Sequence, residues 1–243
     1  MTASPTAPDC TLNHHAHCAN CRLAGICLPI SLEFRDIEML DNIIQRSRPV
    51  QSKAAIYRAG DDFHSVYAVR SGAIKTVKIT EDGIEQITGF RLPGELFGVD
   101  GLAQNSYTNS AIALETSSIC EIPFHRLEEL SLSIPSLQRR FFQLMSKEIV
   151  EEQELITLLS KNNAEQRMAA FLLSLSLRFK HRAFSETDFF LPMPRSDIAN
   201  YLGLTIETVS RVLTRMHKSK LISLDKKHIQ INDMQALSAR YIN

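Results

Sequence analysis

Three cysteines lie within ten residues near the start of the chain, with the spacing Cys18-x2-Cys21-x5-Cys27. A fourth, Cys120, stands much further along the chain, in a β-like run over 118–122. Three clustered thiolates and one distant thiolate form a ligand set that a cubane iron–sulfur cluster accepts. The cysteines therefore indicate a candidate cluster site.

The same residues allow other assignments. Tetrahedral zinc binds thiolates alone or thiolates with imidazoles, and His14, His15 and His17 lie beside the cysteines. A lone cysteine such as Cys120 is also common in protein cores. Spacing alone leaves cluster and zinc open, and Cys10, which lies outside the pattern, is not expected to be a ligand.

The C-terminal third contains the pattern of a helix-turn-helix. Residues 195–202 are predicted to form a short helix, and Gly203-Leu204 the turn after it. Thr205 then caps a second helix that runs to about His217. This arrangement is typical of a domain that places its second helix in the major groove of DNA.

A wing and a basic charge balance accompany this motif. Runs at 222–224 and 229–231 predict a β-hairpin after the second helix. Residues 161–243 hold 13 Lys and Arg against 7 Asp and Glu, whereas 1–160 hold 14 against 20. Charge alone would be equally consistent with solvated lysines, but with the motif it predicts binding to double-stranded DNA.

The second helix presents Glu207, Ser210 and Arg211 on one polar face, near the end that enters the groove. Arg can donate two hydrogen bonds to guanine O6 and N7, and Glu can accept one from cytosine N4. Solvated surface is the common role of such residues, but their position here favours base readout. The residues at the starts of the two helices are further candidate DNA contacts: Arg195, Ser196 and Thr205.

A long helical pattern begins at Pro135 and runs to about Lys161. Along it, steps of three and four residues alternate in a heptad seam, which is typical of a helix that pairs with a second helix. The seam consists of Phe142, Met145, Ile149, Glu152, Ile156 and Leu159. A second stripe is expected to pack on the body of the protein and consists of Leu137, Phe141, Leu144, Leu155 and Leu158. Two apolar faces favour a homodimer, although one wide core face would give a similar pattern.

Glu152 is the charged residue of this seam. In a symmetric dimer it faces its own copy, and like charges that lose water weaken association. Glu152 is therefore a candidate for making dimerisation conditional. The alternative is that its carboxylate reaches the solvated rim.

Short β-like runs occupy residues 50–123, among them 65–69, 74–79 and 84–90. Glycines recur between them at intervals of 12, 11 and 11 residues, at Gly60, Gly72, Gly83 and Gly94. Regular short strands with a glycine at each turn predict a compact antiparallel barrel or roll.

The composition is that of a globular protein, with 44% hydrophobic and 22% charged residues. No apolar run approaches the roughly 18 residues of a membrane span, and the N-terminus lacks the apolar stretch of a secretory signal. We expect a cytoplasmic protein without a membrane partner. In that compartment cysteines more often bind metals or act as redox thiols than form structural disulfides.

Several further motifs lie in the same order as in a known family. They are Cys-Leu-Pro at 27–29, Leu-Asp-Asn-Ile-Ile at 40–44, Glu-Gln-Ile-Thr-Gly-Phe at 85–90, Cys-Glu-Ile-Pro-Phe at 120–124, Leu-Leu-Ser-Lys-Asn-Asn-Ala-Glu at 158–165 and Tyr-Leu-Gly-Leu-Thr at 201–205. With the cysteine loop, they make the chain, from about Cys18 to the end of the wing, resemble the FNR branch of the CRP/FNR transcription regulators.

The resemblance implies a [4Fe-4S] cluster held by Cys18, Cys21, Cys27 and Cys120. It implies a homodimer with cluster bound, and a mainly monomeric protein with weak DNA binding once oxygen degrades the cluster. The base readers then imply inverted half-sites resembling TTGAT and control of anaerobic gene expression. Contacts with RNA polymerase are implied at Thr80–Glu85 and around Arg182–Asp188.

The expected architecture is α+β, with an antiparallel β-roll like that of cyclic-nucleotide-binding domains. We expect a cysteine-rich arm over 1–30, the β-roll over 31–134, the dimerisation helix over 135–161 and a winged helix-turn-helix over 162–243. The β-roll is predicted to open with a helix over 31–47, capped by Ser31, whose apolar side includes Ile37, Leu40, Ile43 and Ile44.

The cyclic-AMP branch of the same family differs at its ligand site. Family members that bind the nucleotide carry a glutamate for the ribose and an Arg-Ser pair for the phosphate, where this chain has Val99 and Asn109-Ser110. That branch also carries an arginine where this chain has Ile206. Without the arginine nothing pairs with the phosphate, so we expect no cyclic nucleotide.

Other functions remain open at this point. A zinc- or thiol-based regulator would keep the DNA-binding role but respond to a different signal. An iron–sulfur electron carrier or enzyme would leave the helix-turn-helix unexplained, and no acid–base constellation stands out. We therefore predict that the protein is not an enzyme.

Overall fold

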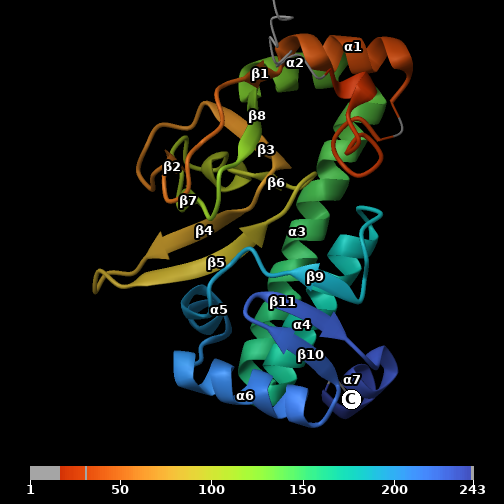
Figure 1. Cartoon of the computed structure of the whole chain (residues 1–243). Coiled ribbons are helices and arrows are strands. Elements are labelled where there is room, and N and C mark those ends of the chain that lie inside the picture. Colours follow the sequence, from red (N-terminus) through yellow and green to blue (C-terminus); the bar gives the residue numbers. More distant parts are fainter. Residues whose placement is uncertain (1–16, 31, 242–243) are drawn as a thin grey trace, which may run out of the picture.

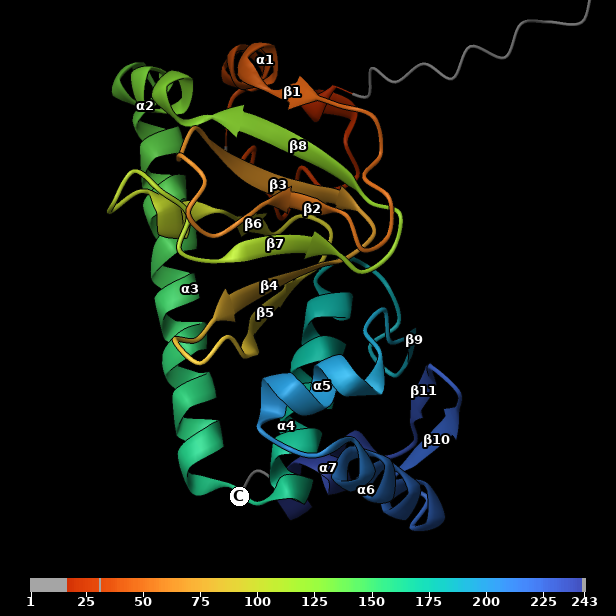
Figure 2. The same cartoon turned by 90° about the vertical axis from the view of Figure 1, so that its left-hand side faces the viewer.

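The computed structural model describes residues 17–30 and 32–241 (Figure 1). An antiparallel β-roll lies at one end of the molecule, a winged helix-turn-helix at the other, and one long helix runs beside both (Figure 2). The fold is α+β, as predicted. Within the described residues, no helix has the length and apolar character required to cross a bilayer.

Two four-stranded antiparallel sheets form the β-roll, in the orders β1-β8-β3-β6 and β2-β7-β4-β5. The strands are β1 (Gln45–Arg46), β2 (Ala55–Tyr57), β3 (Ser65–Ser71), β4 (Ile74–Ile79), β5 (Glu85–Arg91), β6 (Leu96–Phe97), β7 (Ser110–Ala113) and β8 (Ser118–Pro123). The four recurrent glycines all have φ between 75° and 92°, a region that side chains with a Cβ avoid. The regular glycine spacing thus predicted the turns of the roll correctly.

The helix predicted over 31–47 is shorter than expected. Helix α1 runs over Phe34–Ile43 with Glu33 at its N-cap, and Ser31 lies outside the described residues. Residues Gln45–Arg46, predicted to be helical, form strand β1 instead, because their backbone pairs with Glu121 and Cys120 of β8.

Helix α2 (Phe124–Ser133) leads into α3 (Pro135–Lys161), the long helix predicted for this range. Proline stands at the first turn of α3, where its missing N–H costs no hydrogen bond. The inner stripe of α3 packs on the β-roll through buried Leu137 and Phe141. A short 3-10 helix, η1 (Cys18–Asn20), lies in the cysteine loop, and a second, η2 (Val99–Gly101), follows β6.

The C-terminal part of the chain contains the predicted helices and wing. Its elements are α4 (Ala164–Lys180), β9 (Asp188–Phe190), α5 (Arg195–Leu202), α6 (Ile206–Lys218), β10 (Ile222–Asp225), β11 (His228–Ile231) and α7 (Met234–Tyr241). Sequence analysis did not predict α4 or β9. Strand β9 extends the wing into a sheet of order β10-β11-β9.

A continuous apolar core joins this domain to the β-roll. Ile87 and Phe90 of β5 lie in the same buried cluster as Met168 and Leu172 of α4 and Val209 of α6. The two parts of the chain are therefore packed against each other.

Candidate cysteine centre and DNA-binding surface

Four cysteines line one small cavity between the N-terminal loop and the β-roll: Cys18, Cys21, Cys27 and Cys120. The first three come from the loop and η1, whereas Cys120 is fixed in β8 opposite Ala68 of β3 and Arg46 of β1. The structure thus brings the distant thiol to the loop thiols. Among these four, none forms a disulfide.

Burial controls the acidity of three of these thiols. Loss of solvent raises the pKa of Cys18 and of Cys27 to about 12, and neighbouring Asp41 also raises that of Cys18. Burial raises the pKa of Cys120 too, against the opposing effect of Arg46. The thiols of Cys18, Cys27 and Cys120 therefore stay protonated until a cation compensates the negative charge of the thiolates.

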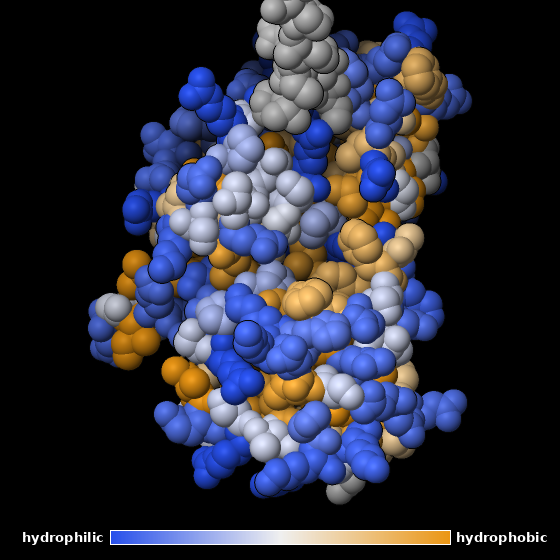
Figure 3. Space-filling view, viewed as in Figure 1, coloured by the Kyte–Doolittle hydropathy of each residue, from blue (hydrophilic) through white to orange (hydrophobic). Residues whose placement is uncertain are grey.

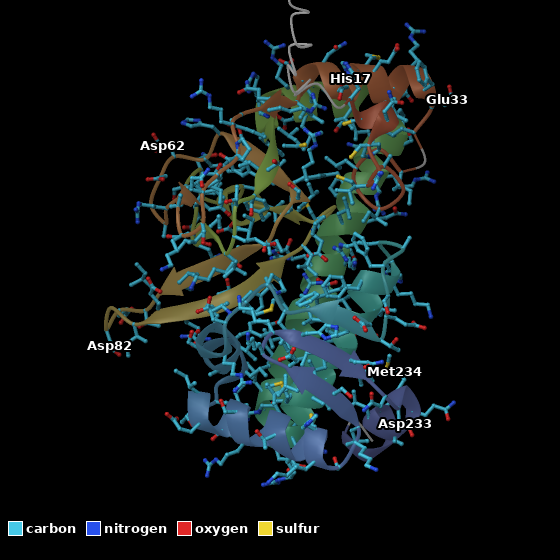
Figure 4. All side chains as sticks on the ribbon, in the orientation of Figure 1. His17, Glu33, Asp62, Asp82, Asp233 and Met234 are labelled. Carbon is cyan, nitrogen blue, oxygen red and sulfur yellow. The ribbon has the colours of Figure 1, made fainter. Side chains whose placement is uncertain are left out.

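Asp41 of α1 organises the start of the cysteine loop. Its Oδ1 accepts a hydrogen bond from the Cys18 backbone N–H at 2.8 Å, and its Oδ2 lies 2.6 Å from Nδ1 of His17. His17 lies beside α1, at the end of the molecule away from the helix-turn-helix (Figure 4). Asp41 also forms an ion pair with Arg46. Although burial opposes ionisation of Asp41, these partners lower the pKa of its carboxyl to about 2.

Arg46 reaches from this network towards the cavity. Its Nη2 lies 3.7 Å from Sγ of Cys18, and its Nε is buried without a hydrogen-bond partner. Buried donors of this kind are rarely left unpaired. A negatively charged hydrogen-bond acceptor in the cavity would match this unpaired donor.

The four thiols form a donor set that a cubane iron–sulfur cluster can use. Zinc requires four ligands that all lie about 2.0–2.3 Å from one point. Within residues 17–30 and 32–241, no three Cys, His, Asp or Glu side chains are arranged to hold one metal ion. A cubane instead bonds each cysteine to a different iron, so its ligands surround a volume, as these four thiols do.

The candidate DNA-binding surface is built on α5 and α6, at the far end of the molecule from the cysteines (Figure 1). Gly203 ends α5 in the left-handed conformation with φ of 61°. Thr205 caps α6 by accepting a hydrogen bond from the Thr208 N–H at 3.1 Å. These two residues fix the turn between the helices, as predicted.

The predicted base readers lie on the outer face of α6. Glu207 and Arg211 are exposed, and Ser210 is half-buried; Nη1 of Arg195 donates to the Ser210 Oγ at 3.2 Å. The Glu207 N–H and the Thr205 side chain lower the pKa of Glu207, which therefore presents a hydrogen-bond acceptor at neutral pH. Ser196 is exposed at the start of α5.

Helix α5 is held against edge strand β5 of the roll. The Asn200 carboxamide accepts from the Ile87 N–H at 2.6 Å and donates to the Glu85 carbonyl at 2.7 Å. Lys75 of β4 forms an ion pair with Asp197 of α5 at 3.0 Å. The β-roll therefore fixes the position of the helix-turn-helix within the protomer.

One side of α3 is uncovered along its length (Figure 2). On it Phe142, Ile149 and Ile156 are 60%, 55% and 66% exposed, and Glu152 is also exposed. Met145 and Leu159 are partly covered within the protomer. The predicted seam thus leaves large apolar side chains in solvent, which is unusual for a helix without a partner.

Sequence reasoning missed two polar residues around the cysteine centre. Asp41 belongs to the motif quoted at 40–44. Nothing in the sequence indicated that its carboxylate would bind the backbone of Cys18, 23 residues away. Arg140, whose guanidinium donates to the carbonyl of Ile26, carried no local signal.

Comparisons with known proteins find a separate family match for each of two parts of the chain. Residues 47–133 match a family described as a cyclic nucleotide-binding domain, and residues 166–240 match a Crp-like helix-turn-helix domain. Among solved structures, FixK2 from Bradyrhizobium japonicum is 28% identical with a TM-score of 0.74, over 81% of this chain and 96% of that one.

Two curated relatives are similar over nearly their whole length. Transcriptional activator protein anr of Pseudomonas aeruginosa is 52% identical over 224 residues, 92% of each chain. The fumarate and nitrate reduction regulatory protein of Yersinia pestis is 49% identical over 222 residues, 91% of this chain and 89% of that protein.

Proposed function

The chain belongs to the FNR branch of the CRP/FNR family of transcription regulators, and from this premise we propose that it is an oxygen-responsive regulator of anaerobic gene expression. It is a DNA-binding protein and not an enzyme. The observation that carries the proposal is the single cavity lined by Cys18, Cys21, Cys27 and Cys120.

A [4Fe-4S] cluster held by these thiols would supply an oxygen-sensitive crosslink between the loop and β8. Residues of the chain would then connect the loop to the dimerisation helix. Asp41 and Arg46 hold the start of the loop, and Leu28 at its end packs in the same buried core as Leu137 of α3. A loop anchored in this way supports α3, and the exposed seam of α3 is then available to a second subunit.

Dimerisation would set the spacing of the DNA-binding surfaces. Two recognition helices of a helix-turn-helix dimer bind half-sites about 34 Å apart. With Glu207, Ser210 and Arg211 facing the bases, the proposed operator is an inverted pair of TTGAT-like half-sites. Loss of the crosslink would weaken the dimer and thereby its affinity for both half-sites.

The β-roll offers little to a cyclic nucleotide, although its fold is that of nucleotide-binding domains. At the positions corresponding to the phosphate pocket, Oδ2 of Asp100 accepts hydrogen bonds from the backbone N–H groups of Thr108 and Asn109 at 3.0 Å and 2.9 Å. The interior is filled by stacked rings, with Tyr57 and Tyr107 centroids 3.8 Å apart. The Asp100 carboxylate thus already accepts the hydrogen bonds from the two backbone N–H groups that an anionic ligand would need.

RNA polymerase is the proposed partner of two further surfaces. The β4–β5 hairpin carries the Thr80–Glu85 loop away from the body, and Figure 3 shows apolar atoms at its tip, where Ile79 and Ile84 are 55% and 62% exposed. In the second surface, the segment around Arg182–Asp188, the side chain of Phe184 is 63% exposed. Exposed apolar side chains in projecting loops are typical of protein contacts.

Anaerobic purification followed by iron, sulfide and zinc analysis tests the proposal directly. We expect about four irons and four sulfides per chain, an absorbance that bleaches in air, and a dimer that dissociates at the same time. Stoichiometric zinc, or a dimer indifferent to air, contradicts the cluster switch and leaves a DNA-binding regulator with another signal.

Arg211→Ala is expected to weaken operator binding by about 1–3 kcal/mol and to relax selectivity at the guanine that Arg211 contacts. The loss arises because both guanine acceptors lose their donor. Titration of the anaerobic protein with operators altered at one base pair measures both effects. Arg215→Ala removes the same charge one turn further along α6, where the side chain pairs with Glu165; a loss of selectivity as large in that control would rule out the assigned role of Arg211.

Glu152→Ala is expected to increase dimerisation in air, since it removes a pair of like charges from the seam. Association about tenfold stronger corresponds to about 1.4 kcal/mol. Sedimentation of the aerobic protein measures it, with Glu154→Ala as the control on the same exposed helix. If Glu152→Ala sediments like the parent protein in air, charge repulsion does not control the dimer.

A further inference from the structure

The guanidinium of Arg140 connects the cysteine loop to the dimerisation helix. From α3, its Nη2 donates to the carbonyl of Ile26 at 2.9 Å and its Nε to the carbonyl of Cys27 at 3.3 Å. Both acceptors belong to the end of the loop, and Cys27 carries one of the proposed ligands. The contact therefore spans more than 110 residues of sequence and joins two functional parts directly.

Within the part of the chain that the structure describes, this arginine has no carboxylate partner. None of the ion pairs among the described residues includes Arg140, and the side chain is half-buried. Hydrogen bonds from a charged donor are stronger than those between neutral groups, and a buried donor left without an acceptor destabilises the folded protein. The two loop carbonyls are thus the groups that compensate this charge, and they do so only while the loop is in place.

The loop is also seated from a second direction. Ile26 packs on the turn between β5 and β6 so closely that a Cβ on Gly94 would lie 2.6 Å from its side chain. Ile26, Gly94 and Arg140 line one pocket, where the loop, the roll and α3 meet. Ile26 is therefore held in a fixed position between the turn and the guanidinium.

The position of Arg140 on α3 gives this contact a consequence for the seam. Arg140 precedes Phe142 by two residues, which places it about 200° around the helix from that side chain. The loop therefore holds α3 from the side opposite the seam. A fixed contact on that side restrains rotation of the helix about its own axis and sets the direction in which the seam points.

We propose that Arg140 is the positioning residue that transmits the state of the cysteine loop to the dimerisation helix, an inference that rests on the function proposed above. With the loop ordered by the cluster, Arg140 holds α3 in the orientation that pairs. When the loop leaves, the guanidinium loses both acceptors, and α3 is no longer restrained from that side.

The test compares dimer dissociation constants of anaerobic protein with cluster and of cluster-free protein, after iron has been measured in each sample. Arg140→Gln removes the charge-assisted bonds, and Arg140→Lys keeps a charge with different geometry. Arg139→Gln removes the neighbouring exposed charge on the same helix and serves as the control.

We expect Arg140→Gln to retain iron and the parental absorbance, yet to dimerise about tenfold more weakly with cluster bound, or about 1.4 kcal/mol. Without cluster its dissociation constant should equal that of the parent protein. With cluster bound, the dissociation constant of Arg140→Lys should lie between those of the parent protein and Arg140→Gln. Arg139→Gln should match the parent protein with and without cluster.

Three results would overturn the inference: parental dimerisation of Arg140→Gln with cluster bound, equal weakening with and without cluster, or loss of iron from this variant. Equal weakening would show general support of α3, and loss of iron would show a role in cluster assembly. If the parent protein itself binds no iron, or dimerises equally in both states, the proposed function fails first and the inference fails with it.

Discussion

Replacing Cys120 by serine is expected to abolish both the cluster and the anaerobic activation of DNA binding. Iron should fall from about four per chain to less than one, because a hydroxyl does not replace a thiolate as a cluster ligand. Operator affinity of the anaerobic protein should then fall at least about tenfold, to the value of the air-exposed parent. Iron analysis and operator titration of the same anaerobic sample measure the two effects.

The choice of Cys120 follows from its position in a strand. The three loop thiols can rearrange together, whereas Cys120 is held in β8 between β1 and β3 and is the ligand that fixes the loop to the roll. Cys10→Ser, outside the motif, is the control and should keep full iron. Serine is nearly isosteric with cysteine, so cluster-free Cys120→Ser should unfold like the cluster-free parent. Full iron in Cys120→Ser would exclude Cys120 as a ligand.

The elements that position both sites could be predicted where the signal was local. Thr205 and Gly203 mark the turn of the helix-turn-helix through their own backbone requirements, and the structure has the cap and the left-handed residue at those positions. The cysteine loop was visible for a similar reason, since its spacing lies within ten residues. Such local sequence signals predict the folded structure correctly because the tertiary contacts favour the same local conformations.

Predictions failed where a distant segment decided the outcome. Gln45 and Arg46 continue a plausible helix, but pairing with β8, some 75 residues away, makes them a strand. In the same way, the ion pair of Arg46 with Asp41 and the bond of Arg140 to the loop depend on which elements meet in space. Charged residues on a helix surface give no sequence signal for such partners.

Glu95 is the residue whose role depends most strongly on these long-range contacts. It follows Gly94 in the turn that supports Ile26, and its Oε1 accepts from Nε of Arg178 at 2.9 Å and from Nη2 of Arg182 at 2.6 Å. Both arginines belong to the end of α4 and the turn after it. One carboxylate thus ties the β-roll, beside the cysteine loop, to the first helix of the DNA-binding domain.

The ionisation of the Glu95 carboxyl is coupled to folding. Burial opposes ionisation of Glu95, but the two guanidinium groups and the N–H of Leu92 outweigh it and hold the pKa of the carboxyl at about 2. Its ordinary value is near 4.5. A folded-state pKa below the unfolded one contributes stability that is fully present above about pH 4.5 and is lost as the pH falls towards about 2.

Glu95→Ala is expected to lower the free energy of unfolding at pH 7 by about 3–5 kcal/mol, because it leaves two largely buried arginines without their carboxylate. Arg182 is 4% exposed and Arg178 is 19% exposed, so water cannot replace the lost partner well. Denaturant unfolding measures the loss, and Glu38→Ala, which removes an exposed carboxylate on α1, should change stability by less than about 0.5 kcal/mol.

The pH dependence separates the charge of Glu95 from its packing. Glu95→Gln keeps the shape of the side chain, so the stability difference between it and the parent protein should shrink as the pH falls from about 6 to about 3, since the parental carboxylate becomes protonated in the unfolded chain over that range. The Glu95→Ala variant should retain a deficit at low pH, because its missing side chain also leaves a cavity between the turn and α4. A Glu95→Gln difference that stays constant over this range would mean that the ion pairs with Arg178 and Arg182 do not hold the two domains together.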